Sequence, residues 1–439
     1  MSPPSTLAEW LAYLETLHPK AIALGLDRVQ SVQSRLGATP ACPVITVAGT
    51  NGKGSTCALL EHMLRADGYR VALYTSPHLL RYNERVRIAG IEATDAALCE
   101  AFAAVEAVRA GTPLTYFEFG TLAALWLFAR QPLDALILEV GLGGRLDAVN
   151  VVAADVAVVT TIAIDHVDYL GPTREDIGRE KAGIFRPGKV AICADRDPPA
   201  TLVGHAAAIG AKLVRIGRDY DYAAHGAQWD YRGPGGARHG LPYPALRGSY
   251  QLANAATALA AADALHDRLP LTMGAVRAAL VGIELRGRFQ VLPGRPVTVL
   301  DVAHNPQAAQ ALADNLGAMG FHPWTIAVFG ILADKDVDGV IGALRPRVDR
   351  WLVATLPRPR GATAPALRLR LEAAGVGPAA IREYADPSAA YHAAREEAAE
   401  NDRIIVFGSF LTVAAALAAT ARAAPARDPH DASLPPTGV

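Results

Sequence analysis

The stretch Ile45–Thr56 most constrains what this chain can fold into, because an apolar strand leads there into a glycine-rich turn and then into a helix. Glycines let successive backbone N–H groups point inward without a Cβ in the way. The helix presents its positive N-terminal end, Lys53 can neutralise phosphate charge, and Ser55 or Thr56 can bind Mg²⁺. The stretch therefore predicts a polyphosphate site. Its residues are Gly49, Thr50, Asn51, Gly52, Lys53, Gly54, Ser55 and Thr56.

The spacing of this loop is unusual. Gly49 lies three residues before Gly52, where the standard phosphate loop has five, and Gly54 separates the lysine from the hydroxyl groups. A tight strand-to-helix turn with a capping serine is the alternative interpretation. The glycines and the lysine together exceed what such a turn requires, so the pattern favours phosphate binding.

The length and charge of the chain limit the classes of protein it can be. Its 439 residues exceed one comfortable hydrophobic core, so we expect two or three domains. The formal net charge of -1 gives no overall attraction to nucleic acid or to an anionic membrane. The cysteines lie far apart and lack metal-ligand spacing, which indicates buried thiols in a reducing compartment. They are Cys42, Cys57, Cys99 and Cys193.

The two ends of the chain argue against export and membrane insertion. Leu7–Leu17 carries Glu9 and lacks a basic-then-apolar pattern, so it predicts an amphipathic helix and not an export signal. Ile404–Ala419 is broken by Gly408 and Thr412, so we expect a strand followed by a packed helix. These patterns predict a cytoplasmic protein.

Short β-branched runs alternate with longer helical runs after the glycine-rich turn. The strands Val44–Val47 and Val71–Tyr74 flank the predicted helix Ser55–Ala66, which is the pattern of a βαβ unit. Continuous apolar strands are typical of a parallel sheet buried on both faces. We therefore expect an α/β fold with a mostly parallel sheet. Further predicted elements are the strands Ala135–Val140, Ala153–Thr161 and Lys189–Cys193 and the helices Thr121–Ala129 and Tyr250–Leu269.

The helical pattern stops around Gly282–Gly287, and a second strand-helix series begins there. We predict an N-terminal domain over residues 1–284, with a β-rich insert at 220–247, and a smaller Rossmann-like domain over 285–420. The segment 421–439 has prolines and charges without periodicity, so we expect it to be disordered. The second series consists of Pro296–Val302, Pro306–Met319, Trp324–Phe329, Trp351–Thr355 and Arg403–Phe407.

Polar residues follow two predicted strands of the first domain. Glu139 lies near the end of one strand, and Asp165-His166 follows another. Because ligands bind beyond the carboxyl ends of parallel strands, Glu139 can face Mg²⁺ held by phosphate, and His166 can join it. Each also has a structural alternative, since strand-end acids are often satisfied within the protein and loop histidines are usually structural.

Three more groups invite both functional and structural interpretations. Lys181 alone would be a helix-surface lysine paired with an acid. Asp301 and His304 follow the first strand of the second domain and open a helix, so they would face any cleft between the domains. Helix capping is the alternative for this segment.

The phosphate loop, the strand-end groups and the second α/β domain together suggest an ATP-driven two-domain ligase. From about Leu7 to about Ala419 the chain resembles the dihydrofolate synthase/folylpolyglutamate synthase family of the ATP-dependent Mur ligase superfamily. The segments that carry the resemblance occur in family order. They are Thr46–Ser55, Ser76–Val86, Glu139–Asp147, Arg179–Ile184 and His304–Pro306.

The resemblance implies that the short glycine loop is the normal, ATP-binding form in this superfamily. It implies two Mg²⁺ ions with Ser55, Glu139 and His166 as ligands, and carbamylation of Lys181, which would turn its amine into a carboxylate-like anion that also holds metal. By position, the resemblance also implies that Asn254, Arg288 and Asp301 contact the nucleotide and that Lys53, Lys181 and His304 are catalytic.

The implied substrates are 7,8-dihydropteroate, tetrahydrofolates and L-glutamate, handled by a monomer with no nucleic-acid or membrane partner. Flat rings would stack on the pterin, basic residues would meet carboxylates, and glutamate would lie against the second domain. The expected substrate-binding residues are Ser76, His78, Arg81, Phe117, Phe119, Asp147 and Ser409.

The expected activity is amide-bond formation through an acyl phosphate, which adds glutamate to dihydropteroate and to the γ-carboxyl group of tetrahydrofolates. A monofunctional folylpolyglutamate synthase stays open, because the sequence does not separate the two activities. A cell-wall precursor ligase would need an N-terminal uridine-binding domain, and only a short segment precedes the loop. A regulatory P-loop ATPase would leave the second domain unexplained.

Overall fold

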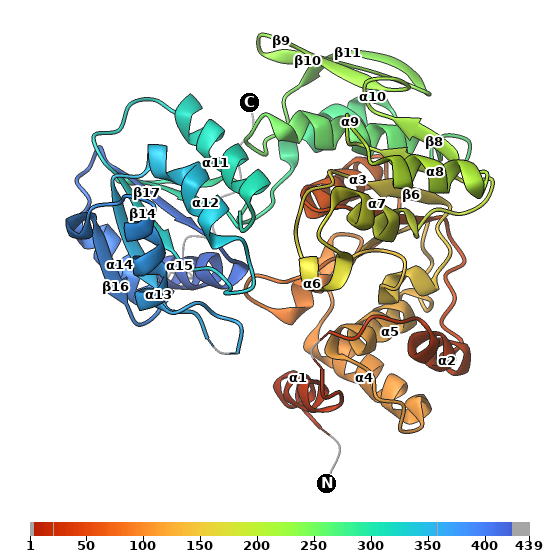
Figure 1. Cartoon of the computed structure of the whole chain (residues 1–439). Coiled ribbons are helices and arrows are strands. Elements are labelled where there is room, and N and C mark those ends of the chain that lie inside the picture. Colours follow the sequence, from red (N-terminus) through yellow and green to blue (C-terminus); the bar gives the residue numbers. More distant parts are fainter. Residues whose placement is uncertain (1–3, 21, 358, 424–439) are drawn as a thin grey trace, which may run out of the picture.

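The computed structural model describes residues 4–20, 22–357 and 359–423 and contains two separate α/β sheets beside one another (Figure 1). The N-terminal sheet has the strand order β4-β3-β2-β5-β1-β6-β7-β8. Neighbours from β2 to β8 are parallel, while β3 and β4 form an antiparallel edge. The expected mostly parallel sheet is confirmed. The strands are β1 (Val44–Ala48), β2 (Val71–Tyr74), β3 (Val86–Ile88), β4 (Ile91–Glu92), β5 (Ala135–Glu139), β6 (Val156–Val159), β7 (Val190–Cys193) and β8 (Lys212–Arg215).

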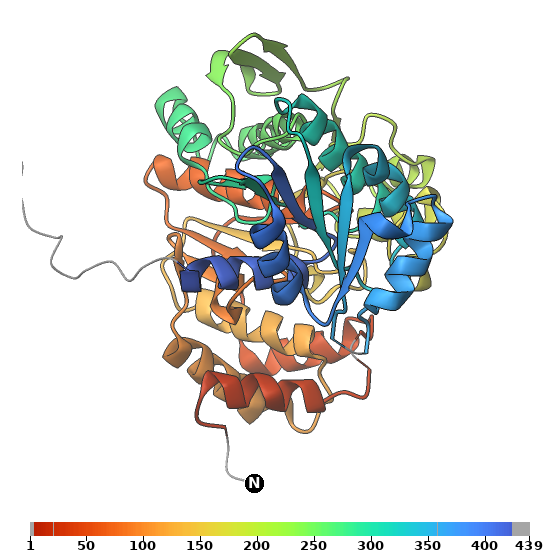
Figure 2. The same ribbon diagram turned by 90° about the vertical axis from the view of Figure 1, so that its left-hand side faces the viewer.

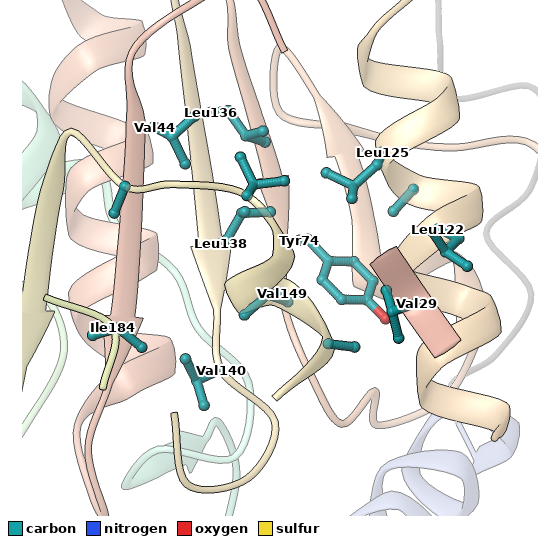
Figure 3. Close-up of a cluster of buried hydrophobic side chains, with 14 of the residues drawn as sticks. Val29, Val44, Tyr74, Leu122, Leu125, Leu136, Leu138, Val140, Val149 and Ile184 are labelled. Atoms are coloured by element: carbon teal, nitrogen blue, oxygen red, sulfur yellow. The ribbon is translucent and has the colours of Figure 1, made fainter. Parts of the chain in front are cut away.

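Helices cover both faces of this sheet, as continuous apolar strands require. On one face α3 (Lys53–Ala66), α9 (Tyr250–Asp263) and α10 (Met273–Gly282) form one core with the strands. The other core, part of which Figure 3 shows, places Tyr74 of β2 near Leu122 and Leu125 of α5. The helices of this second face are α1 (Leu7–Thr16), α2 (Asp27–Leu36), α4 (Asp95–Arg109), α5 (Tyr116–Phe128), α7 (Arg174–Ala182) and α8 (Ala200–Ala208).

Local chemistry explains where the helices start. The helix predicted from Thr121 begins earlier, at Tyr116, because Thr115 and Glu118 form a capping box that satisfies the first backbone N–H groups. The predicted helix Tyr250–Leu269 is shorter and ends at Asp263. A separate helix, α10, then follows from Met273.

Residues 221–242 form a three-stranded antiparallel sheet with the order β11-β10-β9. It lies at the side of the molecule that carries α9, opposite the α1 and α4 side, in both views (Figures 1 and 2). Trp229, Tyr231 and Leu241 bury its inner face in the same core as α9. The strands are β9 (Asp221–His225), β10 (Gln228–Gly233) and β11 (Gly236–Pro242).

The C-terminal sheet has the order β12-β13-β17-β14-β15-β16, with only β12 antiparallel. One core packs α11, α12 and α13 on one face, and another packs α14 and α15 on the other. The strands are β12 (Gln290–Leu292), β13 (Val297–Leu300), β14 (Thr325–Phe329), β15 (Arg350–Ala354), β16 (Ile381–Tyr384) and β17 (Arg403–Phe407). The helices are α11 (Pro306–Ala318), α12 (Val337–Leu344), α13 (Ala364–Ala373), α14 (Pro387–Glu397) and α15 (Phe410–Ala423).

The predicted smaller C-terminal α/β unit is therefore present, while the exact domain division at 284/285 stays a prediction. The predicted tail starts too early, because α15 continues to Ala423, and the rest of that segment lies outside the described residues. Among the helices of the described part of the chain, none has the length and apolar character needed to cross a membrane.

Candidate active site

The glycine-rich turn connects β1 to α3 in a conformation that only glycine adopts easily. Gly49 has φ 145°, and a Cβ there would lie 1.7 Å from Thr160 Oγ1. Gly52 has φ 90°, and a Cβ there would lie 2.6 Å from Asn254 Oδ1. The glycines therefore permit close contact with β6 and α9, which a capped turn alone would not require.

Residues that follow β6 hold this turn in place through hydrogen bonds. The Thr50 N–H donates to the Thr161 carbonyl at 2.7 Å, and the Thr160 hydroxyl donates to the Asn51 carbonyl at 2.7 Å. Lys53 Nζ donates to the carbonyl groups of Gly49 and Thr50 at 3.1 and 3.3 Å. Its ammonium group thus stays over the turn, where a phosphate would meet it.

A cavity of about 450 Å³ lies between the carboxyl edges of the two sheets and is lined from both. The N-terminal side contributes the phosphate turn and the ends of β5 and β6. The C-terminal side contributes Arg288, just before β12, and the segments after β13, β14, β15 and β17. The structure therefore brings together most of the predicted site residues. Those that line the cavity are Gly49, Thr50, Asn51, Gly52, Lys53, Gly54, Ser55, Ser76, Glu139, His166, Lys181, Asn254, Arg288, Asp301, His304 and Ser409.

Glu139, the last residue of β5, points toward the start of α3. A Cβ on Gly54 would lie 3.7 Å from Glu139 Oε1, and the Ser76 N–H donates to Oε2 at 3.1 Å. Burial raises the pKa of Glu139, while the charge of Lys53 acts in the opposite sense. Glu139 and the Ser55 hydroxyl thus provide two oxygen donors beside the phosphate turn, as a hard divalent cation prefers.

Lys181 is buried near the C-terminal end of α7 and lines the cavity. Burial, followed by the nearby charge of Lys53, lowers the pKa of Lys181 to about 7. No carboxylate of the described residues lies within ion-pair distance of its amine. The alternative of a surface lysine paired with an acid is therefore wrong.

Asp165, which follows β6, is the centre of a polar network that joins the two sheets. Its carboxylate accepts from Lys335 Nζ at 2.6 Å and lies 3.6 Å from His304 Nε2. Lys335 Nζ also lies 3.1 Å from His166 Nε2. Burial lowers the pKa of His166 to about 4, so its ring is neutral and able to act as a ligand at ordinary pH.

A second connection lies at the tip of the phosphate turn. Asn305 Nδ2 donates to Asn51 Oδ1 at 3.0 Å, and Asn51 Nδ2 donates to Gln307 Oε1 at 2.7 Å. Asn305 also caps α11, because its side-chain oxygen accepts from the Ala308 N–H. The N-cap residue of α11, a helix of the C-terminal part of the chain, is therefore hydrogen-bonded directly to the phosphate turn.

The other predicted residues on the C-terminal side contact nearby backbone groups or the cavity wall. Asp301 accepts from the N–H groups of Phe289 and Ala303, both at 2.8 Å, and burial raises its pKa. Ser409 Oγ accepts from the Leu411 N–H at the start of α15. The Arg288 guanidinium lies 5.0 Å from the centre of the Phe410 ring, at the wall of the cavity.

Six predicted residues do not line the cavity. Thr56 and Phe119 are fully buried, and Phe119 packs against Phe102 at 5.9 Å between ring centres, so its ring has no face open to a pterin. His78 accepts from Arg85 Nε at 2.8 Å, and Arg81 is exposed and pairs with Glu92. The six are Thr56, His78, Arg81, Phe117, Phe119 and Asp147.

Phe117 and Asp147 lie just behind the cavity wall. A Cβ on Gly141, which lines the cavity, would lie 2.7 Å from the ring of Phe117. Asp147 accepts from the N–H groups of Leu142 and Val149, and burial raises its pKa to about 7. Phe117 is half-buried and Asp147 is buried, so each lies behind a residue that lines the cavity and does not line it itself.

Sequence reasoning missed several cavity residues. Lys335 follows β14, and Thr160 and Thr161 follow β6, so the rule that ligands bind beyond strand ends would have found them. Gln307 lies in the first turn of α11 and carried no such signal.

Comparison with known proteins agrees with this architecture. A family model described as the Mur ligase middle domain matches residues 47–262, and one described as the Mur ligase glutamate ligase domain matches residues 287–410. The fold and the interdomain cavity therefore define a ligase of the Mur type, a class of ATP-dependent enzymes.

The closer relatives narrow this class. The dihydrofolate synthase/folylpolyglutamate synthase of Escherichia coli is 48% identical over 411 residues, which cover 93% of this chain and 94% of that protein. A solved structure of E. coli FolC in complex with DHPP and ADP is similar with a TM-score of 0.91 at 46% identity, covering 97% of this chain and 100% of that one. The chain belongs to the dihydrofolate synthase/folylpolyglutamate synthase family of Mur ligases.

Another similar structure shows what a relative binds. It is a bifunctional folylpolyglutamate synthase/dihydrofolate synthase with Mn, AMPPNP and L-glutamate bound. Its TM-score is 0.88 at 46% identity, with 96% of this chain and 100% of that chain covered.

Proposed function

We propose that this protein is an ATP-dependent ligase that joins L-glutamate to dihydropteroate, giving dihydrofolate, and to the γ-carboxyl group of tetrahydrofolates. The observation that carries this proposal is the single cavity in which the phosphate turn of one sheet faces the polar edge of the other. A nucleoside triphosphatase alone needs only the first of these edges. Membership in a family of ligases, with a relative that holds a nucleotide analogue and glutamate together, supports the choice.

The phosphates of ATP would lie over the turn Gly49–Ser55, where backbone N–H groups, the N-terminus of α3 and Lys53 provide positive charge. Asn254, Arg288 and Asp301 line the adjoining wall, and we assign them to the nucleotide. Asp301 would act largely through Phe289 and Ala303, whose backbone it holds.

The donor set fits a divalent cation between Ser55 and Glu139, because a hydroxyl and a buried carboxylate flank the phosphate turn. The cation would neutralise charge on the phosphates during transfer. His166 fits a second cation by its neutral ring, although Lys335 now lies against its free nitrogen. No group of three metal-ligating side chains is assembled among the described residues, so the ligand set depends on the nucleotide.

Lys181 is our candidate for carbamylation. Addition of CO₂ requires a neutral amine, and a pKa of about 7 supplies one at physiological pH. The carbamate would place a negative charge beside Lys53, whose ammonium now disfavours the protonated form of Lys181. Its oxygens would then be further donors for the cation.

The chemistry proceeds in two steps. The carboxylate of the folate substrate attacks the γ-phosphorus of ATP, while Lys53 and the N–H groups of the turn stabilise the transferring phosphoryl group and ADP leaves. The amine of glutamate then attacks the acyl phosphate, phosphate leaves, and an amide bond remains. Water would hydrolyse the intermediate, so contacts such as Asn51–Asn305 that close the two sheets on one another protect it.

The two substrates approach from different sides. We place the pterin beside Phe117 and Asp147, with the Ser76–Arg87 segment around the benzoyl part. Glutamate would lie against the C-terminal sheet, near His304 and Ser409. The resemblance to this family favours a monomer, and the requirement for ATP and the free thiols favour the cytoplasm.

A ligation assay tests the proposal. Labelled glutamate and MgATP are offered with 7,8-dihydropteroate or with tetrahydrofolate in separate reactions, and products are separated by chromatography. Labelled product with both acceptors is the expected result. Product from tetrahydrofolate alone would establish the monofunctional alternative, and ATP hydrolysis indifferent to acceptor and glutamate would overturn the assignment as a ligase.

A further inference from the structure

Arg85 is a buried arginine without an acidic partner. It ends the short helix η1 (Tyr82–Arg85) and is only 9% exposed. Its neighbours in sequence are paired, since Arg81 contacts Glu92 and Arg87 contacts Glu61. No carboxylate of the described residues lies within 4.0 Å of the Arg85 guanidinium nitrogens, by the same distance that defines those ion pairs.

Neutral and aromatic groups hold this guanidinium instead. Its Nε donates to His78 Nδ1 at 2.8 Å, and its centre lies 5.2 Å from the Tyr82 ring and 5.5 Å from the Tyr116 ring. Burial lowers the pKa of His78 to about 4, so the histidine is a neutral acceptor. The side chain is thus fixed in place by contacts none of which is an ion pair.

Arg85 does not itself line the reaction cavity, but Ser76 and Pro77, at the start of its segment, do. It belongs to the segment that begins with Ser76, whose N–H donates to Glu139, and its charge acts on the Glu139 carboxyl group. Tyr116, one of the rings that hold it, is the first residue of α5, so the positive end of that helix dipole lies nearby. The next residue, Phe117, packs behind the cavity wall at Gly141.

A buried charge is costly unless an opposite charge accompanies it. Here the charge of Arg85 acts on Glu139, but no carboxylate of the described residues forms an ion pair with it, so the guanidinium is left able to bind a ligand. A guanidinium is suited to a carboxylate, because its planar fork matches the two oxygens. The aromatic rings also exclude water around it, so the interaction would be stronger than at an exposed site.

We propose that Arg85 binds the benzoate carboxylate of dihydropteroate and holds it for attack on ATP, while His78 acts as the residue that positions the guanidinium. This inference rests on the proposed function and adds to it the group that recognises the acceptor. It also gives His78, which does not line the cavity, an indirect role.

A double-mutant cycle between protein and ligand tests this contact. Equilibrium binding is measured for 7,8-dihydropteroate and for its analogue with hydrogen in place of the carboxyl group, in the presence of Mg²⁺ and a non-hydrolysable ATP analogue. The wild-type protein should prefer the carboxylate ligand by about 10- to 100-fold. The Arg85→Met protein should bind the two ligands about equally, and Arg85→Lys should retain a reduced preference.

Arg130 provides a matched control. Its guanidinium also lies over an aromatic ring, that of Trp126 at 3.5 Å, but beyond the C-terminal end of α5. Arg130→Met should keep the full preference for the carboxylate ligand. Thermal unfolding of each variant identifies loss of folding, and Arg85→Lys carries the comparison if Arg85→Met does not fold.

The outcomes separate this inference from the proposed function. If the wild-type protein ligates glutamate but the variants at Arg85 keep the wild-type preference between the two ligands, the Arg85 contact is overturned and the function stands. If both ligands lose affinity equally in Arg85→Met and in Arg85→Lys, the residue is only structural and the inference also falls. If the wild-type protein neither binds dihydropteroate nor ligates glutamate, the proposed function fails and takes this contact with it.

Discussion

The two sheet edges that face the cavity differ in how their polar groups are satisfied. On the N-terminal edge, Lys53 rests on carbonyl groups and Lys181 lacks an acidic partner within the described chain. On the C-terminal edge, Asp301 holds two N–H groups and Asn305 caps a helix. The first edge therefore keeps charge available for a ligand, whereas the second uses its polar groups to shape backbone and to reach across the cavity. Substitutions on the first edge should change chemistry, and those on the second should change stability and placement.

Replacement of Lys53 should give the largest effect. Lys53→Ala removes the cation from the phosphate turn without removing a core contact, so turnover should fall by about 1,000-fold or more, with little change in melting temperature. Initial rates of ATP-dependent ligation and thermal unfolding measure the two. Lys212→Ala, at an exposed position of β8, is the control and should be active. Near-normal ligation by Lys53→Ala would show that the N-terminal edge does not perform phosphoryl transfer.

Depletion of CO₂ should have the second-largest effect on activity if Lys181 is carbamylated. Ligation in CO₂-free buffer should fall by about 10- to 100-fold and recover on addition of bicarbonate. At a fixed CO₂ pressure the effect should grow as the pH rises through about 7, because the amine then loses its proton. An ordinary lysine would be neutral in only about one molecule in a thousand near neutrality. Activity independent of CO₂, together with an unmodified mass for the Mg²⁺-loaded protein, would refute the modification.

Lys335 tests how the second edge controls the first. Its ammonium lies 3.1 Å from His166 Nε2, so it competes with a cation for that nitrogen. Lys335→Met should therefore bind Mn²⁺ about 3- to 10-fold more tightly in the presence of a non-hydrolysable ATP analogue, measured by electron paramagnetic resonance. Ligation should nevertheless slow, because the contact with Asp165 that joins the sheets is lost. Weaker Mn²⁺ binding would mean that Lys335 supports the metal site.

The same contrast explains what the sequence could predict. Lys53, Glu139, His166 and Asp301 were found because glycine spacing and strand ends are local patterns, and parallel strands bring their ends to one edge. The same rule places Lys335 at the facing edge, but its contact with His166 depends on the relative placement of the two sheets, which no local pattern encodes.

The error at Phe119 has a different cause. Phe117 and Phe119 were predicted together as stacking residues, but they lie in the first turns of α5. Residues two apart on a helix point about 200° away from one another, so they cannot face one ligand. Phe117 lies behind the cavity wall, and Phe119 packs into the core against Phe102. Recognition of the capping box at Thr115 would have revealed this helix.

The smallest expected effect concerns Asn305, which both caps the N-terminus of α11 and contacts the phosphate turn. Asn305→Ala removes the N-cap of α11 and the contact with Asn51, whereas Asp386→Ala removes the N-cap of α14, which has no contact with the phosphate turn. Loss of a cap should lower the free energy of unfolding by about 1 kcal/mol in each variant. Only Asn305→Ala should also raise the KM for glutamate or ATP, by about 2- to 5-fold, because it loosens the closure of the cavity. Equal kinetics in the two variants would show that the Asn51–Asn305 contact stabilises the structure without guiding the substrates.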